Sequence, residues 1–411
     1  MNKADTAWMV IATGMVMLMT PTLAFFYGGL VRKKNVLSIL MQCMILLAVI
    51  SLQWILIGYS LAFGPTVGGI IGSFKYAFLN GVGLAPKEGM TIPHQLFMMF
   101  QMMFAVITPA LIVGAFAERI KFSGFLIFSL LWTTLIYDPM AHWVWGGGWL
   151  SKFESLGGGG ALDFAGGTVI HITAGISALV FSIMLGKRLG NAQNRSPHNL
   201  PFAVLGAGFL WFGWFGFNAG SELAIDNVTV SALLNTNTAA AAGALTWMIL
   251  DWFIHKKPTM LGVITGIIAG LVAVTPAAGF VTPMASIAIG ALGSIFGYIF
   301  VDKIKVKYGY DDSLDVFGVH GIAGIVGALA TGLFATKAIN SAGADGLFYG
   351  NPIQLLIQSI GVVVAIIFSG AGTFILFKIV DKLVGMRVTK KEENIGLDLT
   401  QHQEAGYTLV D

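Results

Sequence analysis

The sequence predicts an all-α polytopic membrane protein with about eleven transmembrane helices. Of its 411 residues, 56% are hydrophobic and only 10% are charged, whereas soluble domains carry roughly 25% charged residues. The mean hydropathy is +0.80. Such a chain has too few polar side chains to cover its surface in water, which excludes a soluble enzyme and a disordered protein. The alternating pattern of an outer-membrane barrel is absent.

Charge and cysteine content exclude further classes. The net charge of +3 is small and diffuse, which gives no support for nucleic-acid binding. Cys43 is the single cysteine, so neither an internal disulfide nor a cysteine metal site is expected. The 53 glycines are typical of helices that approach one another closely in lipid.

Membrane-crossing helices need about 20 mostly apolar residues each. Runs of this kind are separated by charged or Gly-, Pro- and Asn-rich segments. Asp5 interrupts the start of the first run, which then continues to Leu30; this is too long for a signal peptide, so we expect an uncleaved first span. In chain order, we predict spans at about 7–31, 35–62, 94–118, 122–148, 164–186, 201–221, 231–253, 259–278, 281–301, 316–335 and 353–380.

The distribution of Lys and Arg predicts the orientation. With the N-terminus outside, 18 of the 23 basic residues fall in cytoplasmic segments and five fall outside. Cytoplasmic loops carry an excess of Lys and Arg, so this orientation is favoured. An odd number of spans then places the tail, from about Arg387, in the cytoplasm of a cell-membrane protein.

Two short patterns recur five spans apart. The pattern H-x-x-A-G-I begins at His171 and again at His320, and Thr-Pro-Ala begins at Thr108 and again at Thr275. Because five is odd, the copies run in opposite directions, which is typical of an inverted repeat with its substrate site near the midplane. We expect a membrane transport domain at 1–386 and a cytoplasmic tail at 387–411; the first repeat covers about 7–186, the second about 201–335, and the eleventh helix about 353–386.

Ionisable side chains at membrane depth are functional candidates because they are costly there. The candidates are Asp163, His171, Asp315, His320 and Glu118. We predict that the two histidines face each other with ring nitrogens roughly 2.7–3.2 Å apart; the simpler interpretation is two packing histidines. Two histidines alone do not complete a metal site. For both aspartates the simpler interpretation is helix capping, which we favour for Asp315.

Aromatic side chains cluster towards the outer ends of three spans. An aromatic box with one hydroxyl can hold a small cation by cation–π attraction, whereas interfacial belts and lipid-facing bulk are the simpler interpretation. We favour that simpler interpretation for Trp143 and Trp214. The cluster comprises Phe100, Phe104, Trp143, Trp145, Trp211, Phe212, Trp214, Phe215 and Phe217, followed by Ser221.

Seven longer motifs follow one another along nearly the whole chain. They are FFYGGLVRKKN at 25–35, GAFAER at 114–119, VWGGG at 144–148, DFAGGTVIH at 163–171, WFGFNAGS at 214–221, TPAAG at 275–279 and DVFGVH at 315–320. These motifs resemble those of the ammonium transporter family (Amt/Mep/Rh), of the prokaryotic Amt type. The resemblance implies eleven helices, an inverted five-helix repeat, a homotrimer and one pore per subunit.

The resemblance also implies roles for single residues. The outer recruitment site would comprise Trp145, Phe104 and Ser221, with Asp163 nearby. The phenyl gate would be Phe104 and Phe217, beside Phe100. The pore would be lined by His171, His320, Thr275, Leu23, Phe26, Tyr27 and Val316.

The expected function is ammonium transport without a cofactor, catalytic residue or metal. NH₄⁺ would be recruited at the aromatic site and deprotonated, and NH₃ would cross an apolar pore past the two histidines. Methylammonium is a further expected substrate. The tail resembles the family's tail motif but has Gln403 where that motif has glycine, and a PII-type signalling protein is an expected partner at the tail and the 186–200 loop.

Three alternatives stay open at this point. An ammonium sensor in a transporter fold would need an added signalling domain, and only about 25 residues follow Arg387. An intramembrane hydrolase would need a nucleophile paired with a base, and no Ser or Asp pairs convincingly with either histidine. A transporter of another small amine or of a gas is the third alternative.

Overall fold

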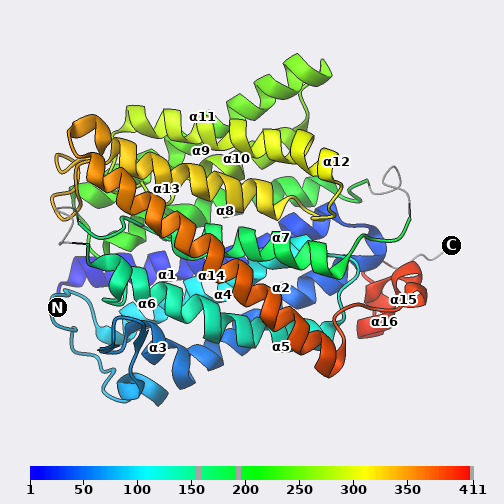
Figure 1. Ribbon diagram of the computed structural model, residues 1–411, viewed down its shortest axis with the longest axis horizontal. Coiled ribbons are helices and arrows are strands. Elements are labelled where there is room, and N and C mark those ends of the chain that lie inside the picture. The colour runs from blue at the N-terminus through cyan, green and yellow to red at the C-terminus, as the bar shows by residue number, and fades with distance from the viewer. Residues whose placement is uncertain (154–158, 191–195, 408–411) are drawn as a thin grey trace.

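The computed structural model describes residues 1–153, 159–190 and 196–407. Its helices lie side by side along the long axis of the molecule (Figure 1). The α-helices are α1 (Lys3–Leu30), α2 (Val36–Gln53), α3 (Tyr59–Phe63), α4 (His94–Phe116), α5 (Phe122–Trp132), α6 (Asp138–Val144), α7 (Thr173–Leu185), α8 (Leu200–Ala219), α9 (Asn227–His255), α10 (Met260–Val274), α11 (Pro283–Tyr298), α12 (Lys305–Tyr308), α13 (Ala323–Phe334), α14 (Pro352–Val384), α15 (Lys390–Ile395) and α16 (Leu397–His402). Strands β1 (Thr66–Val67) and β2 (Ile71–Gly72) form one antiparallel hairpin.

The predicted spans correspond to these helices. Within the described ranges, nine segments are long and apolar enough to cross a membrane, and α10 is a shorter apolar helix of 15 residues. Helix α9 has 29 residues but carries several Asn and Thr side chains and is not among the nine. With α9 and α10 added, the arrangement agrees with the prediction of about eleven spans. Of the predicted 186–200 loop, residues 191–195 lie outside the described residues, as do 408–411 of the tail.

Several spans pass through π-helical turns rather than continuing as plain α-helix. Turns η4 (Thr133–Tyr137) and η10 (Ile299–Ile304) lie in the fourth and ninth spans, and η7 (Gly167–Ile172) and η11 (Phe317–Ile322) lie in the fifth and tenth. Each pair is five spans apart, as the inverted repeat requires. Such turns are frequent at functional sites, and η7 and η11 carry the two histidines. A further π-turn, η2 (Trp54–Gly58), joins α2 to α3.

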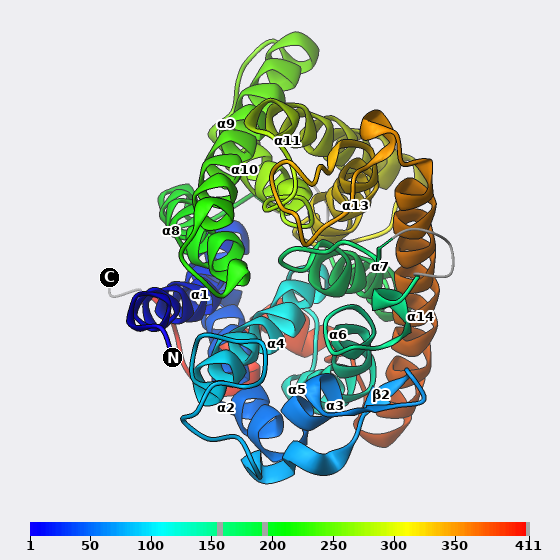
Figure 2. The ribbon, with the colours of Figure 1, turned by 90° about the vertical axis from the view of Figure 1, so that its left-hand side faces the viewer.

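The helices form two groups with a lateral helix beside them. In Figure 2, α9, α10, α11 and α13 lie in the upper part and α2, α4, α5 and α6 in the lower part, with α14 along the right edge. Helices α1 and α8 pack closely because Gly206 and Gly213 admit the neighbouring helix: a Cβ at Gly206 would lie 2.5 Å from the backbone nitrogen of Phe26. Small residues allow this close approach.

The H-x-x-A-G-I motifs meet where the fifth and tenth spans cross. A Cβ at Gly175 would lie 2.2 Å from the backbone nitrogen of Gly321, and one at Gly324 would lie 3.2 Å from Cβ of His171. The glycines of the motif therefore allow two backbones to touch, and this contact brings the motif histidines together.

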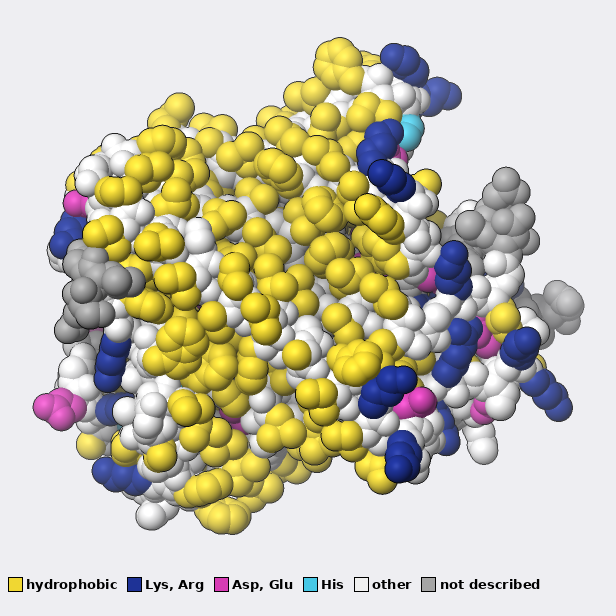
Figure 3. Space-filling model, viewed as in Figure 1, with side chains coloured by type: hydrophobic (Ala, Val, Ile, Leu, Met, Phe, Trp, Pro, Cys, Tyr) yellow, Lys and Arg dark blue, Asp and Glu magenta, His cyan; other side chains and the backbone are white. Residues whose placement is uncertain are grey.

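On the face shown in Figure 3, apolar side chains cover the middle of the molecule as an apolar belt, and charged side chains gather at its two ends. We call the end that carries the N-terminus the N-face, and the end that carries α15 and α16 the tail face (Figure 1). The tail docks on its own chain: Leu397 N–H donates to Asn35 Oδ1 at 2.8 Å, and Ser38 N–H donates to Asp398 Oδ1 at 2.8 Å. Thr389 and Glu392 form a capping box that begins α15.

Candidate functional site

A cavity of about 350 Å³ opens on the N-face and contains the predicted recruitment residues. Trp145, Phe104 and Ser221 all line it, together with Gln101. The Ser221 hydroxyl donates to the Phe217 carbonyl at 2.8 Å, so its oxygen keeps lone pairs free to accept a hydrogen bond. The buried Oε1 atom of Gln101 has no hydrogen-bond partner among the described residues.

Asp163 does not line this cavity but organises its wall. The carboxylate is 6% exposed and accepts four backbone N–H groups, from Gly166 (2.9 Å), Gly167 (2.6 Å), Thr168 (2.9 Å) and Val169 (2.9 Å). Gly166 has φ +110°, a conformation that L side chains rarely adopt. Asp163 therefore caps the beginning of the fifth span.

The backbone of Asp163 also fixes Trp145, the tryptophan of the expected recruitment site. Trp145 Nε1 donates to the Asp163 carbonyl at 2.8 Å, which orients the indole ring. The capped turn and the aromatic wall of the cavity are thus one unit, in which Asp163 acts as a positioning residue.

Stacked phenyl rings close the bottom of the N-face cavity. Phe104 and Phe217 stack with centroids 4.3 Å apart and planes at 20°. Phe100 packs on Phe104 at 4.8 Å, and Trp145 meets the edge of Phe104 at 6.2 Å. All three phenyl groups are at most 1% exposed. The rings therefore separate the cavity from the interior and would have to move to let a molecule pass.

His171 and His320 lie directly beyond the phenyl rings. Their Nδ1 atoms are 3.2 Å apart, within the predicted range, and both rings are buried. The centroids of Phe217 and His171 are 6.1 Å apart. A small chamber of about 10 Å³ adjoins both histidines and is otherwise apolar; Leu23 and Phe26 line it as predicted. His171 Nε2 has no hydrogen-bond partner in the described part of the chain.

The interpretation of Trp214 and Trp143 as belt or lipid-facing residues is wrong. Trp214 is 2% exposed, stacks on His171 at 5.4 Å and 20°, and donates from Nε1 to Thr275 Oγ1 at 2.8 Å. Trp143 is 9% exposed and donates to the Ile70 carbonyl at 2.6 Å. Composition could not reveal this burial, because tryptophan is common both at the membrane interface and inside helix bundles.

The capping role expected for Asp315 belongs instead to Asp312. Asp312 is 1% exposed, and its Oδ2 accepts from the Phe317 N–H at 2.7 Å. Asp315 is paired with Lys305 at 2.5 Å. The sequence held a signal for Asp312, which precedes His320 by eight residues as Asp163 precedes His171. Burial raises the pKa of Asp312 to about 6, although the charge of Lys305 opposes that rise.

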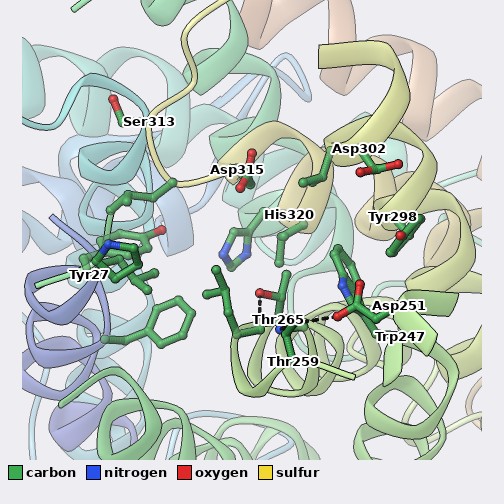
Figure 4. Close-up of a pocket in the computed structure, with 18 of the residues that line it drawn as sticks. Tyr27, Trp247, Asp251, Thr259, Thr265, Tyr298, Asp302, Ser313, Asp315 and His320 are labelled. Carbon is green, nitrogen blue, oxygen red and sulfur yellow. Dashed lines mark hydrogen bonds between the residues drawn. The ribbon is translucent and has the colours of Figure 1, made fainter. Parts of the chain in front are cut away.

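A second cavity, of about 290 Å³, opens on the tail face and reaches His320 (Figure 4). Phe26 and Tyr27 line it, and the Tyr27 hydroxyl donates to the Leu111 carbonyl at 3.0 Å. Val316 and Thr275, the other predicted pore residues, line none of the three cavities described here. Thr275 is buried and holds Trp214, and Val316 is buried near Gly114 and Tyr27.

Glu118 lines none of these cavities and lies in a buried ion-pair network at the tail face. It pairs with Arg32 at 2.8 Å and with Arg188 at 2.9 Å, and it accepts from Asn35 Nδ2 at 2.9 Å. Arg188 also pairs with Asp311 at 2.8 Å. Burial would raise the pKa of Glu118, but the hydrogen bond from Arg32 and the charge of Arg188 outweigh it and lower the pKa to about 2. Across the described ranges, no three His, Cys, Asp or Glu side chains gather as a metal site.

Comparison with known proteins shows likeness over the whole chain. The sequence profile of the Ammonium Transporter Family matches residues 7–407. The chain is 53% identical over 408 residues to an ammonium transporter of Bacillus subtilis, covering 99% of both chains. It is also similar to a crystal structure of Candida albicans Mep2, with TM-score 0.90, 36% identity, and 99% and 93% of the two chains covered. A solved sensor Amt protein gives TM-score 0.87 at 33% identity, covering 97% and 98%.

Proposed function

The chain belongs to the ammonium transporter family, and from this premise we propose that it recruits NH₄⁺ at the N-face and conducts NH₃ to the tail face. The observation that carries the proposal is an uninterrupted series of side chains between the two cavities. It runs from Trp145 through Phe104 and Phe217 to His171 and His320. The family is one of transporters rather than enzymes.

The N-face cavity suits a small cation with N–H donors. The Trp145 and Phe104 rings offer cation–π attraction, and Ser221 oxygen can accept a hydrogen bond. The carboxylate of Asp163 adds negative charge behind this wall, although its own lone pairs are occupied by the four backbone N–H groups. The cation therefore loses part of its water shell where replacement interactions exist.

The interior favours the neutral form. Beyond the stacked rings the chamber is narrow and almost wholly apolar, so a bare cation would bear a large desolvation penalty there. Neutral NH₃ needs only one or two hydrogen-bond partners. We therefore place deprotonation at the phenyl gate, where NH₄⁺ gives its proton to water in the N-face cavity and only NH₃ continues inward. This step separates ammonium from K⁺, which has no proton to lose.

The paired histidines supply hydrogen-bond partners without supplying charge. In the Nδ1–Nδ1 contact, one ring donates and the other accepts, so one neutral imidazole carries its proton on Nδ1 and the other on Nε2. This leaves one donor and one acceptor at the two Nε2 atoms. NH₃ can both accept and donate a hydrogen bond, so it would bind first to one histidine and then to the other as it crosses the chamber.

Uptake of ¹⁴C-methylammonium and ammonium-driven alkalinisation of the lumen, which follows from entry of NH₃, test the proposal in proteoliposomes. We expect both signals above those of protein-free liposomes, and we expect excess ammonium but not excess K⁺ to suppress the tracer uptake. Signals equal to those of protein-free liposomes would overturn the proposal.

Several features of the assembled protein belong to the same proposal. We infer a transport domain at 1–386 and a tail at 387–411, with the N-face outside the cell and the tail face in the cytoplasm. The excess of Lys and Arg at the tail face supports this orientation. We also infer a homotrimer in the cell membrane, active in nitrogen uptake and bound at the tail face by a PII-type protein.

A signalling role is the second candidate function. The likeness to a sensor Amt protein supports it. A sensor would bind ammonium at the N-face cavity with little net flux, so vesicles in which binding is saturable but uptake is at background would favour this candidate over transport.

A further inference from the structure

Three carboxylates face the tail-face cavity, and their charges are balanced differently. Asp251, Asp302 and Asp315 all line it. Asp302 pairs with Lys303 at 2.8 Å, and Asp315 pairs with Lys305 at 2.5 Å. For Asp251, no ion pair is present within the described residues, so it is the carboxylate with an uncompensated charge.

Asp251 is nevertheless buried. It lies in α9, is 6% exposed, and accepts a hydrogen bond from the neutral Thr259 hydroxyl at 2.6 Å. The neighbouring Gly262 makes room for it, because a Cβ there would lie 2.1 Å from Asp251 Oδ2. A buried carboxylate without an opposite charge is costly. The close approach of Gly262 to Asp251 and the lack of an opposite charge therefore both suggest a cation site.

Two aromatic side chains flank this carboxylate. Trp247 is 4% exposed and Tyr298 is 3% exposed; their rings are 5.3 Å apart at 67°, and both line the cavity. The Tyr298 hydroxyl has no hydrogen-bond partner in the described part of the chain. Figure 4 shows Trp247, Asp251, Tyr298 and Asp302 on one side of the cavity and Tyr27 on the opposite side, with His320 between them.

We propose that Trp247, Asp251 and Tyr298 form a second ammonium site, filled from the solution at the tail face. The carboxylate supplies charge and strong acceptors, the Tyr298 hydroxyl supplies another acceptor, and the rings offer cation–π attraction. The proposal rests on the proposed function, because the cavity also contains His320 at the end of the pathway. Ammonium bound there would occupy the exit and slow uptake as ammonium accumulates inside.

Thallium(I), a cation close to ammonium in size, tests the site by anomalous diffraction. In crystals of the full chain soaked with thallium(I) acetate, we expect an anomalous peak between Asp251 and Tyr298 that ammonium displaces and Na⁺ does not. The peak should vanish in Asp251→Asn, which keeps an acceptor for Thr259, and persist in the matched control Asp302→Asn. A wild-type soak without a peak there, or a peak that survives in Asp251→Asn, would overturn the proposal.

Inhibition of uptake by ammonium in the lumen tests whether filling the second site slows transport. In proteoliposomes sorted so that the tail face lines the lumen, luminal ammonium should slow ¹⁴C-methylammonium uptake by wild type, and Asp251→Asn should need roughly tenfold more ammonium for the same effect. Each variant is compared with its own rate without luminal ammonium, so the gradient affects all of them alike. Asp302→Asn should respond like wild type, and equal luminal K⁺ should have a smaller effect.

The outcomes separate the two proposals. If wild type transports but luminal ammonium slows it and Asp251→Asn equally, the second site is refuted and the proposed function stands. If wild type does not transport, the proposed function is refuted and the diffraction experiment decides the site alone.

Discussion

Side chains along the proposed pathway are oriented by hydrogen bonds that lie outside it. Trp145 is held by the Asp163 carbonyl, and Trp214 by Thr275. The Thr275 hydroxyl in turn donates to the Leu271 carbonyl at 2.7 Å. Each ring can therefore present a face to the pathway while its polar atom is satisfied elsewhere. This matters because an unsatisfied indole N–H in an apolar interior would be costly.

The recruitment tryptophan offers a direct test at this scale. Trp145→Leu removes a cation–π contribution of about 0.5–2 kcal/mol, so the apparent affinity for ammonium should fall roughly 2- to 30-fold. Suppression of ¹⁴C-methylammonium uptake by increasing ammonium concentrations in proteoliposomes measures this affinity. Trp145→Phe is the matched control, because it also loses the indole N–H but keeps an aromatic face, and it should lose less. Equal affinities in all three proteins would indicate that Trp145 only fills space.

The paired histidines give a second prediction. His171→Ala removes one of the two hydrogen-bonding rings beside the chamber and leaves the Nδ1 of His320 without its partner. We expect a changed rate and a changed preference between ammonium and methylammonium, with the elution volume of the oligomer unaltered. Flux ratios measured at matched protein density provide the comparison; identical rate and preference in the variant would contradict a role in conduction.

At the scale of elements, broken helices bring the chemistry together. The fifth and tenth spans each begin with an aspartate that accepts backbone N–H groups, Asp163 and Asp312, and each continues through a π-turn that carries a histidine. Gly175 and Gly321 let the two spans touch. Capping stabilises these interior helix starts because their N–H groups have no partner in the preceding turn.

Glu118, which follows α4, forms ion pairs with Arg32 after α1 and with Arg188 after α7. These ion pairs predict that the stability of the fold depends on pH. The Glu118 pKa of about 2 lies below the ordinary 4.5, so ionised Glu118 stabilises the fold fully above about pH 4.5. This stabilisation, about 3 kcal/mol, is lost as pH falls from 4.5 towards 2. Glu118→Gln should therefore lower the Tm at pH 7, and the difference from wild type should shrink below pH 4.5.

The matched control for this prediction is Glu404→Gln, because Glu404 is exposed at the tail. Substitutions at such positions usually change stability by less than about 0.5 kcal/mol. Thermal unfolding in detergent between pH 7 and pH 3 measures both variants. A Glu118→Gln deficit that stays constant over this range would refute the assignment of the effect to ionisation.

At the scale of the whole molecule, exposed apolar side chains and the docked tail bear on the proposed trimer. Large apolar side chains remain exposed on α8 and α9, among them Phe209, Phe212, Leu245 and Phe253. Lipid or a neighbouring subunit would cover them in the proposed trimer. The tail is bound through Glu393 to Arg387 at 2.9 Å and through Asp398 to Ser38, which holds α16 against the start of α2.

Deletion of the tail tests regulation at this scale. A PII-type partner must reach the pore from the tail face, so removal of residues from Thr389 onward should weaken its block of flux while the spans stay folded. Basal flux should also fall if the tail links neighbouring subunits. Asp398→Ala, which releases α16 from the start of α2 without shortening the chain, is the control for lost docking alone. The tail is a plain solvated extension if two results are found together: the deletion changes neither the flux nor the regulation of the flux, and a pull-down under ammonium shock recovers no PII-type protein.

Much of the fold and part of the site could be predicted from the sequence. Apolar runs of membrane length predicted the spans, because backbone polar groups in lipid can be satisfied only by regular helices or closed barrels. The spacing of the motifs at His171 and His320 predicted an antiparallel pair of spans, and the structure brings these two rings within 3.2 Å. Local patterns were sufficient here because the thickness of the membrane sets the length of each apolar run. The number of spans between two motifs sets their relative direction.

Only the tertiary structure decided which polar and aromatic side chains face the pathway. Trp214 is buried although Phe212, two residues earlier in α8, is exposed, and Trp143 in α6 is buried as well. Asp312 rather than Asp315 caps its span. The surroundings of Asp251 likewise depend on α11, which supplies Tyr298 from a distant part of the sequence. In a chain that is apolar on nearly every helix face, hydropathy cannot distinguish lipid from a helix neighbour, because both are apolar surroundings; the packing of distant helices makes that distinction.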